Sequence, residues 1–128
     1  TTYAILGGFM KRIDWYQELE IPKEVVVLGA TYQIVITEKD LSDMAEKREE
    51  VAGTCSVYSN VIEIYSDDFD DYVTDMEIRE QKAKVHHTLR HELIHALFIQ
   101  SGLDYTYGDD ECLVDFLAVQ IPKIKEYF

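Results

Sequence analysis

Apolar side chains recur along this chain at two spacings, one typical of strands and the other typical of helices. The first strand signal is the apolar run Val25–Leu28, after which Tyr32, Ile34 and Ile36 alternate with mostly polar neighbours. Alternation with period two places every second side chain on the same face of a strand. The segment therefore predicts a strand pair, or one bent strand, interrupted at Gly29.

A second pair of strands is predicted further along the chain. Residues 54–58 and 61–65 are rich in strand-forming residues and are separated by Ser59-Asn60, a pair that favours a turn. This pattern indicates a β-hairpin. Two roles are open for a hairpin strand beside a helix: it can pair with an extended peptide through its free backbone groups, or it can be an ordinary edge strand.

Helical spacing is clearest after residue 74. Thr74 and Glu77 form a capping box and Gly102 supplies a left-handed stop, which predicts a long helix over residues 75–100. The apolar positions on its expected core face are Leu89, Leu93, Ala96 and Leu97.

A second helix is predicted after the connection at residues 103–108. Asp109 or Asp110 caps this helix, and Pro122 bends or ends it. Its expected core-facing residues are Leu113, Val114, Phe116 and Leu117.

Two shorter helices are expected in the first half of the chain. One covers residues 13–19 and ends before Pro22, because the residue before a proline is pushed out of the α region. The other begins at an N-cap at Thr37, runs to about residue 50 and is closed by Gly53. Strands combined with these helices predict an α+β fold.

The length of 128 residues predicts a single domain over residues 1–128, which can bury about two-thirds of its unfolded surface. Residues 1–9 have neither the basic start nor the cleavage site of a signal peptide, so we interpret them as an N-terminal extension or an addition ahead of the native start. No apolar run approaches the ~20 residues that cross a bilayer, and no membrane span is expected.

Charge narrows the expected partners. Twenty-five acidic and twelve basic residues give a net charge of −13, which repels a phosphate backbone and argues against nucleic-acid or anionic-membrane binding. A neutral or basic protein partner is favoured. The acidic residues 67–71 lack the glycine and the final glutamate of a calcium loop, so we interpret them as a solvated loop.

Two cysteines make no disulfide framework and fit a reducing, cytoplasmic compartment. Cys112 is expected on the buried side of its helix. Cys55 is expected to be a small buried residue, with a role as metal ligand as the alternative.

The strongest chemical signal is His91-Glu92-Leu93-Ile94-His95. Histidines four residues apart lie one turn apart on the same helix face, so both imidazoles can reach one metal ion. Glu92 projects about 100° around the helix from His91, where its carboxylate can take a proton from metal-bound water. This is the His-Glu-x-x-His pattern of zinc hydrolases.

Two histidines leave a catalytic zinc one protein ligand short, because such sites use three protein ligands and one open position. Glu111 follows His95 by sixteen residues, and Asp115 lies one turn further on the same helix face. His87 shares a helix face with His91 and His95, but a single zinc cannot be bound by residues ~12 Å apart along a helix axis. We therefore expect His87 at the rim of the site.

His-Glu-x-x-His followed by Glu-x-x-x-Asp resembles the gluzincin branch of zinc metallopeptidases. The small size and the run from Glu111 to Ala118 look most like the small metallopeptidases of phages and mobile elements related to the ImmA/IrrE group. The resemblance covers about residues 85–122. It departs from the larger gluzincins in a shorter spacer and in the lack of their extra domains.

The resemblance implies a minimal zincin-like domain, with a small mixed or antiparallel sheet packed on the long His-Glu-x-x-His helix and a Glu-bearing helix after it. It implies Zn²⁺ bound by His91, His95 and Glu111, with Asp115 orienting a ligand histidine and Glu92 acting as general base on a peptide or protein substrate. A cysteine ligand upstream of the motif, as in peptide deformylases, is the alternative for Cys55.

Three further residues are candidates for stabilising the oxyanion of a peptidase reaction: Tyr105, Tyr107 and His87. Two other function classes fit the same sequence. One is a zinc-bound, non-proteolytic regulator that recognises a protein partner, and the other is a metal-free acidic decoy that binds a basic protein by charge. The sequence carries no signal for an oligomeric state.

Overall fold

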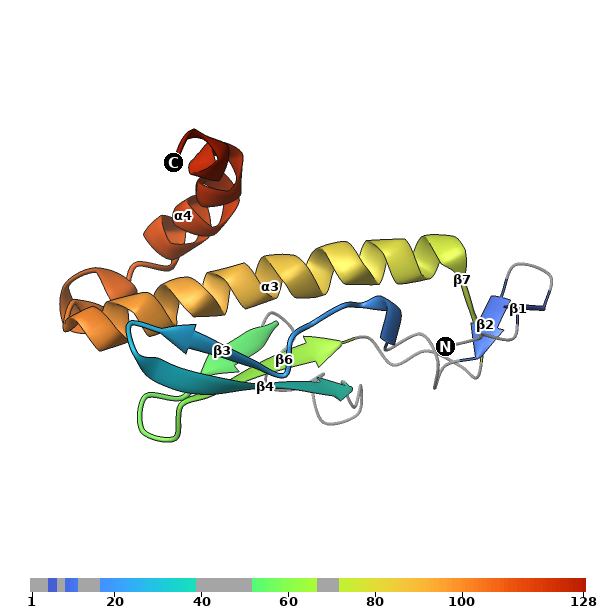
Figure 1. The fold of residues 1–128 in the computed structure, drawn as a ribbon, viewed down its shortest axis with the longest axis horizontal. Helices are drawn as coiled ribbons and strands as arrows, with labels where there is room; N and C mark the ends of the chain where they lie inside the picture. Colours follow the sequence, from blue (N-terminus) through green and yellow to red (C-terminus); the bar gives the residue numbers. More distant parts are fainter. Residues whose placement is uncertain (1–4, 7–8, 12–16, 39–51, 67–71) are drawn as a thin grey trace.

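The computed structural model describes residues 5–6, 9–11, 17–38, 52–66 and 72–128. It is an α+β structure in which one long helix lies across a four-stranded mixed sheet (Figure 1). The strands of this sheet are β3 (Glu24–Val27), β4 (Ala30–Glu38), β5 (Gly53–Cys55) and β6 (Val61–Ser66), in the order β3-β4-β6-β5. The helices are α3 (Asp75–Ser101) and α4 (Glu111–Ile124), with the short helical segments η1 (Asp104–Gly108) and η2 (Lys125–Tyr127).

Of the two alternatives predicted around Gly29, a strand pair or one bent strand, the structure has the strand pair, which is an antiparallel hairpin of β3 and β4. Leu28 and Gly29 both have positive φ, 48° and 85°, as a two-residue hairpin turn requires. Tyr32 and Ile34 are buried, whereas Gln33 between them and Val35 after them are exposed, so the alternation in the sequence corresponds to the two faces of the sheet.

The predicted second hairpin is also confirmed, since β5 pairs antiparallel with β6. In contrast, β4 and β6 pair in parallel, so the sheet is mixed. Strand β4 continues through Glu38, and Thr37 is therefore not a helix cap as predicted. Gly53 begins β5, so its predicted role as a helix end is also wrong. The rest of that predicted helix, and the acidic residues 67–71, lie outside the described residues.

The long helix matches its prediction to within one residue. The Thr74 side chain accepts a hydrogen bond from the Glu77 backbone at 3.1 Å, and Gly102 closes the helix in the left-handed region. Buried residues of α3 pack on the sheet together with Leu19, Tyr32, Ile62 and Ile64.

The second helix begins as predicted, with the Asp110 side chain accepting a hydrogen bond from the Leu113 backbone. Its core face is narrower than predicted. Val114 and Ala118 are buried, whereas Phe116 is 58% exposed and Cys112 is exposed, so both predictions of burial are wrong. The reason is helical spacing, because residues two positions from Val114 point about 200° away from it.

A smaller antiparallel sheet lies at the opposite end of α3 from α4 (Figure 1). Its strands are β1 (Ile5–Leu6), β2 (Phe9–Lys11) and β7 (Tyr72–Thr74). Of the short helix predicted over residues 13–19, the described part includes Gln17 and Glu18, which are helical. No described helix is long and apolar enough to cross a membrane.

Candidate metal site

The motif residues lie in the C-terminal half of α3 and face the space between β5 and α4. One ligand atom from each of His91, Glu92 and His95 lies within 4.8 Å of the others. The two imidazole rings are 5.0 Å apart between centroids and meet edge to face. This is the geometry that a four-residue separation on a helix produces, because one turn advances about 5.4 Å.

Glu111 reaches the same point from α4. One of its carboxylate oxygens, Oε2, lies 2.7 Å from Nε2 of His91, and the other, Oε1, lies 3.1 Å from Nε2 of His95. Both imidazole nitrogens therefore point at one carboxylate from a different helix. Two neutral histidines and a carboxylate are a common ligand set for divalent zinc.

The packing of α4 on α3 sets the position of Glu111. Ile94 of α3 contacts Val114 and Ala118 of α4 in a small core of its own, with Phe98 and Leu117 packed at its edge. Because Glu111 begins α4, this small core holds its carboxylate over the two histidines.

Asp115 lies one turn after Glu111 and binds the outer sides of two imidazoles. Its Oδ1 atom is 2.9 Å from Nε2 of His87 and 3.4 Å from Nδ1 of His91. A carboxylate on Nδ1 favours the tautomer that leaves Nε2 of His91 free to bind a metal. His87 thus contacts the candidate site through Asp115, at the rim of the larger cavity described next.

Two cavities meet at Gly53, Glu92 and Glu111. The larger one, about 530 Å³, extends past His87, Thr88 and His91. The other, about 320 Å³, extends past Cys55, His95 and Asp104. Together they form a cleft along β5, between this strand, α3 and the start of α4.

Glu92 is the buried acid at the centre of this cleft. Burial is the main cause that raises its pKa, and Glu111 raises it further, while His95 and His91 act in the opposite direction. The carboxylate is therefore held beside the metal-ligand candidates in surroundings that increase its affinity for a proton.

Gly53 is a site residue that the sequence pattern did not single out. A Cβ atom at this position would lie 2.7 Å from Cγ2 of Thr88, 2.8 Å from the backbone oxygen of Glu63 and 3.4 Å from Cγ of Glu92. Only glycine lets β5 approach α3 this closely. The sequence pattern predicts a helix end at this glycine; its place directly before the strand predicted over residues 54–58 is the signal that could have indicated close backbone approach.

Cys55 lines the smaller cavity but is not one of the residues in the tight group around His91 and His95. Burial, followed by the charges of Glu92 and Asp104, raises the pKa of its thiol to about 12. These surroundings favour the neutral thiol over the thiolate that a metal requires.

The two tyrosine candidates lie away from the cleft. Tyr105 is 93% exposed, and the ring of Tyr107 packs against Phe98 with centroids 6.1 Å apart. Neither residue lines the two cavities formed by the described residues.

Comparison of the chain with protein-family models, with curated proteins and with solved structures gave no match.

Proposed function

We propose that this chain is a zinc-dependent metallopeptidase with a minimal zincin-like fold. The observation that carries the proposal is the pair of contacts between Glu111 and the Nε2 atoms of His91 and His95, at 2.7 and 3.1 Å. Three such protein ligands leave the fourth position of a tetrahedral zinc open, as hydrolytic sites require. When bound, zinc lowers the pKa of water and polarises a carbonyl group.

Two carboxylates, Glu92 and Glu111, compete for the third ligand position. Glu92 comes from the same helix as the histidines and is buried at the cleft, whereas Glu111 has one oxygen on each imidazole nitrogen. We therefore assign Glu111 as ligand and Glu92 as general base. A carboxylate with a raised pKa suits a group that takes a proton from water and later delivers it to the leaving amine.

The substrate in this proposal is a peptide in extended conformation along β5. This strand is at the edge of the sheet that the described residues form, and the cleft runs beside it past Glu92. Backbone N–H and C=O groups on a free strand edge can pair with a peptide backbone without selecting particular side chains. A substrate lying there would bring a carbonyl group next to the open position of the proposed zinc site.

Two further residues have supporting roles in the proposal. Asp115 lies 3.4 Å from Nδ1 of His91, where its carboxylate would favour the tautomer that binds a metal through Nε2. His87 lines the larger cavity, so it is a better placed candidate than Tyr105 or Tyr107 for donating to the oxyanion of the reaction.

Glu92→Gln tests the proposed function, because it preserves the size of the side chain and removes its basicity. The expected result is one zinc ion per chain in both wild type and variant, with peptide cleavage reduced by ~10²- to 10⁴-fold in the variant. Zinc is measured by elemental analysis after dialysis, and cleavage by mass spectrometry on a library of proteome-derived peptides. Glu126→Gln, at an exposed position on η2, is the matched control.

Each alternative function predicts a different result in this experiment. Stoichiometric zinc without cleavage by wild type would contradict the peptidase and support a non-proteolytic regulator. Failure of the wild type to retain zinc would support the acidic decoy. Loss of zinc from Glu92→Gln alone would mean that Glu92 is itself a ligand.

A further inference from the structure

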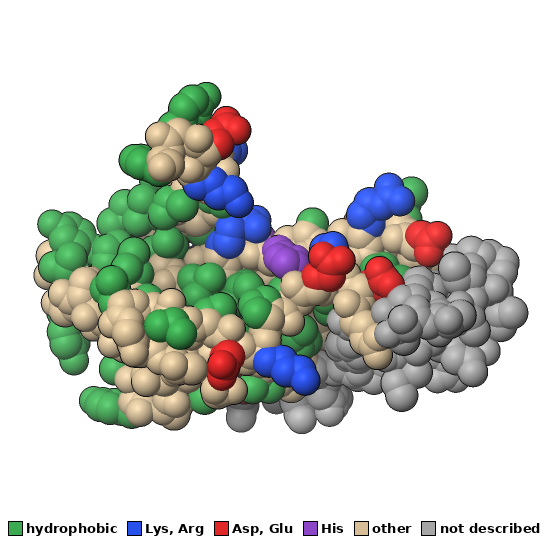
Figure 2. Space-filling view, viewed as in Figure 1, with side chains coloured by type: hydrophobic (Ala, Val, Ile, Leu, Met, Phe, Trp, Pro, Cys, Tyr) green, Lys and Arg blue, Asp and Glu red, His purple; other side chains and the backbone are tan. Residues whose placement is uncertain are grey.

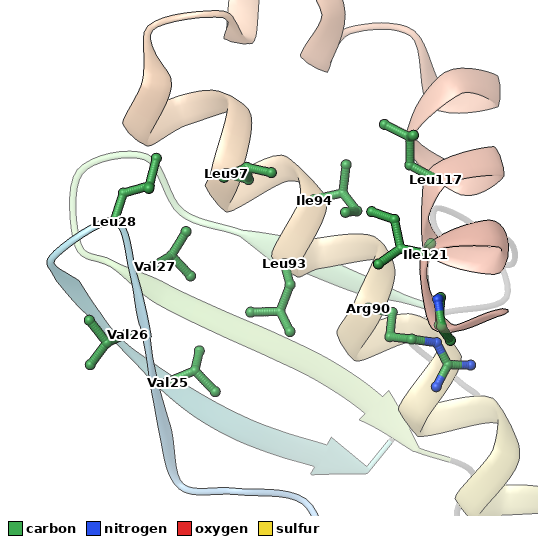
Figure 3. A pocket seen from close by; sticks show the side chains of 12 residues that line it. Val25, Val26, Val27, Leu28, Arg90, Leu93, Ile94, Leu97, Leu117 and Ile121 are labelled. Carbon is green, nitrogen blue, oxygen red and sulfur yellow. The ribbon is translucent and has the colours of Figure 1, made fainter. Parts of the chain in front are cut away.

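A second hollow lies on the opposite flank of α3 from the metal site. It is a groove of about 450 Å³ between the β3–β4 hairpin, α3 and α4 (Figure 3). Figure 2 shows apolar side chains gathered over this end of the molecule. Eleven of the twelve lining residues are apolar: Val25, Val26, Val27, Leu28, Leu93, Ile94, Leu97, Leu117, Ala118, Ile121 and Pro122.

Arg90 is the polar exception, at one end of the groove (Figure 3). Its Nε atom is buried and has no hydrogen-bond partner among the described residues. A buried donor without a partner destabilises a protein, so native structures rarely leave one unpaired. An apolar groove that ends at a guanidinium whose Nε lacks a partner is complementary to an apolar ligand that carries a carboxylate.

The groove is open rather than enclosed. Val26 and Leu28 on its hairpin wall are 67% and 64% exposed, whereas small-molecule pockets bury most of the surface of their ligands. Along α3 the wall extends from Arg90 to Leu97, seven residues or about 10 Å, which is two helical turns. The dimensions fit the apolar face of a helix better than a small molecule.

We propose that this groove binds an amphipathic helical segment of a protein partner, with apolar side chains over two turns and one carboxylate placed against Arg90. The partner is neutral or basic outside this segment, because the net charge of −13 repels an acidic protein at long range. The same charge opposes binding of a second copy of this chain. Helix-in-groove recognition uses apolar anchors at i, i+3, i+4 and i+7.

The groove shares both of its helices with the metal site. Leu93 and Ile94 on α3 lie between Glu92 and His95 in the sequence, and Leu117 follows Asp115 by two residues on α4. A segment held against Leu117 and Ile121 would fix α4 on α3, and with it the carboxylate of Glu111. This coupling depends on the proposed function, whereas occupation of the groove does not.

A display library tests the proposal with helices of defined chemistry in place of the partner protein. The library consists of 14-residue helices with Leu or Ile at i, i+3, i+4 and i+7 and with neutral or basic residues elsewhere. One position that flanks these anchors is varied and carries Glu, Gln or Lys in equal amounts. Selection on the wild-type chain in the presence of a chelator is expected to enrich Glu at that position. Selection on Arg90→Gln is expected to lose this preference, while Arg79→Gln, on an exposed part of α3, is expected to keep it.

Binding constants of selected peptides provide the second measurement. The Glu peptide is expected to bind wild type about 10- to 100-fold more tightly than its Gln counterpart, and Arg90→Gln is expected to abolish this difference. Leu97→Glu is expected to abolish binding of both peptides, whereas Met76→Glu, at an exposed apolar position of α3 outside the groove, is expected to leave binding unchanged.

Several results would overturn the proposal. The first two are enrichment of Gln or Lys at the flanking position and absence of any enriched peptide. The third is a groove that binds a fatty acid, dodecanoate, in preference to the peptides. The fourth is a wild-type dimer that Leu97→Glu dissociates. If the peptide binds in chelator but its affinity is unchanged by zinc, the groove site stands and the coupling fails, since linkage must be reciprocal. Failure of the metal site would leave the chelator measurements intact.

Discussion

Glu111 is 66% exposed at its side chain, yet both of its oxygens contact a histidine. Packing of α4 on α3 brings Glu111 over the two histidines, and its exposed carboxylate then contacts both imidazoles directly. This distinguishes Glu111 from Glu92, which is buried, and it makes the ligand assignment testable at one residue.

Glu111→Ala is expected to weaken zinc binding by at least ~10- to 100-fold, because even changes behind the ligands of a metal site have effects of that size. Asp115→Ala should weaken binding less, since Asp115 acts on the metal only through His91 and is not itself an assigned ligand. Competition titration with a chromophoric chelator measures both affinities. Full zinc retention by Glu111→Ala, together with an empty site in Glu92→Ala, would reverse the assignment.

Cys55 and Cys112 differ in surroundings although both are single thiols. Because burial raises the pKa of Cys55 to about 12, alkylation by iodoacetamide at pH 8.5 is expected to modify the exposed Cys112 first and Cys55 only after unfolding. Peptide mapping by mass spectrometry separates the two. Rapid alkylation of native Cys55 at pH 8.5 would show that its thiolate is accessible.

The raised pKa also means that Cys55 contributes stability below pH ~9 that is lost as the pH rises towards 12, since the unfolded thiol ionises first.

At the scale of single elements, β5 depends on Gly53 for its position against α3. Gly53→Ala is expected to destabilise the fold by about 1–3 kcal/mol, because the new methyl group would collide with Thr88 and with the backbone of Glu63. Any cleavage activity should fall with it, since β5 lines the cleft. Urea unfolding measures the change.

Thr54→Ala, at the next and exposed position of the same strand, is the control for Gly53→Ala and should change stability by less than about 0.5 kcal/mol. If the two substitutions have equal effects, close approach of β5 to α3 is not the reason for a glycine at position 53.

The helices show how far local patterns extend. The N-cap at Thr74, the glycine stop after Ser101 and the N-cap at Asp110 all act within one turn, and each was predictable from the sequence. The core face of α4 was not, because Phe116 has the same apolar character as Val114. Only contact with Ile94 of α3 decides which of the two is buried.

At the scale of the whole molecule, the charge of −13 sets up repulsion that opposes the compact state. Screening by salt shortens this repulsion, so the melting temperature is expected to rise by a few degrees between low and physiological ionic strength. Differential scanning calorimetry measures it. A melting temperature that falls with salt would mean that ion pairs such as Lys82–Glu20, at 3.1 Å, outweigh the repulsion.

The amino-acid sequence by itself determined the strand alternation, the hairpin of β5 and β6, the caps of α3 and α4, and the placement of His91 and His95 on one helix face. These features depend on residues within one or two turns of each other, where bond geometry and side-chain spacing leave few choices. The sequence could place Glu111 on a following helix, but its role as ligand came from resemblance to a family.

Tertiary structure decided what lies between elements. It paired β4 with β6 in parallel, brought Gly53 against Thr88, and set the oxygens of Glu111 at 2.7 and 3.1 Å from the histidines. It also left the groove at Arg90 open. Distances between elements are set by how their apolar faces pack, and many sequences of similar pattern pack at different angles. Such distances therefore follow only once the cores around Ile64 and around Val114 have formed.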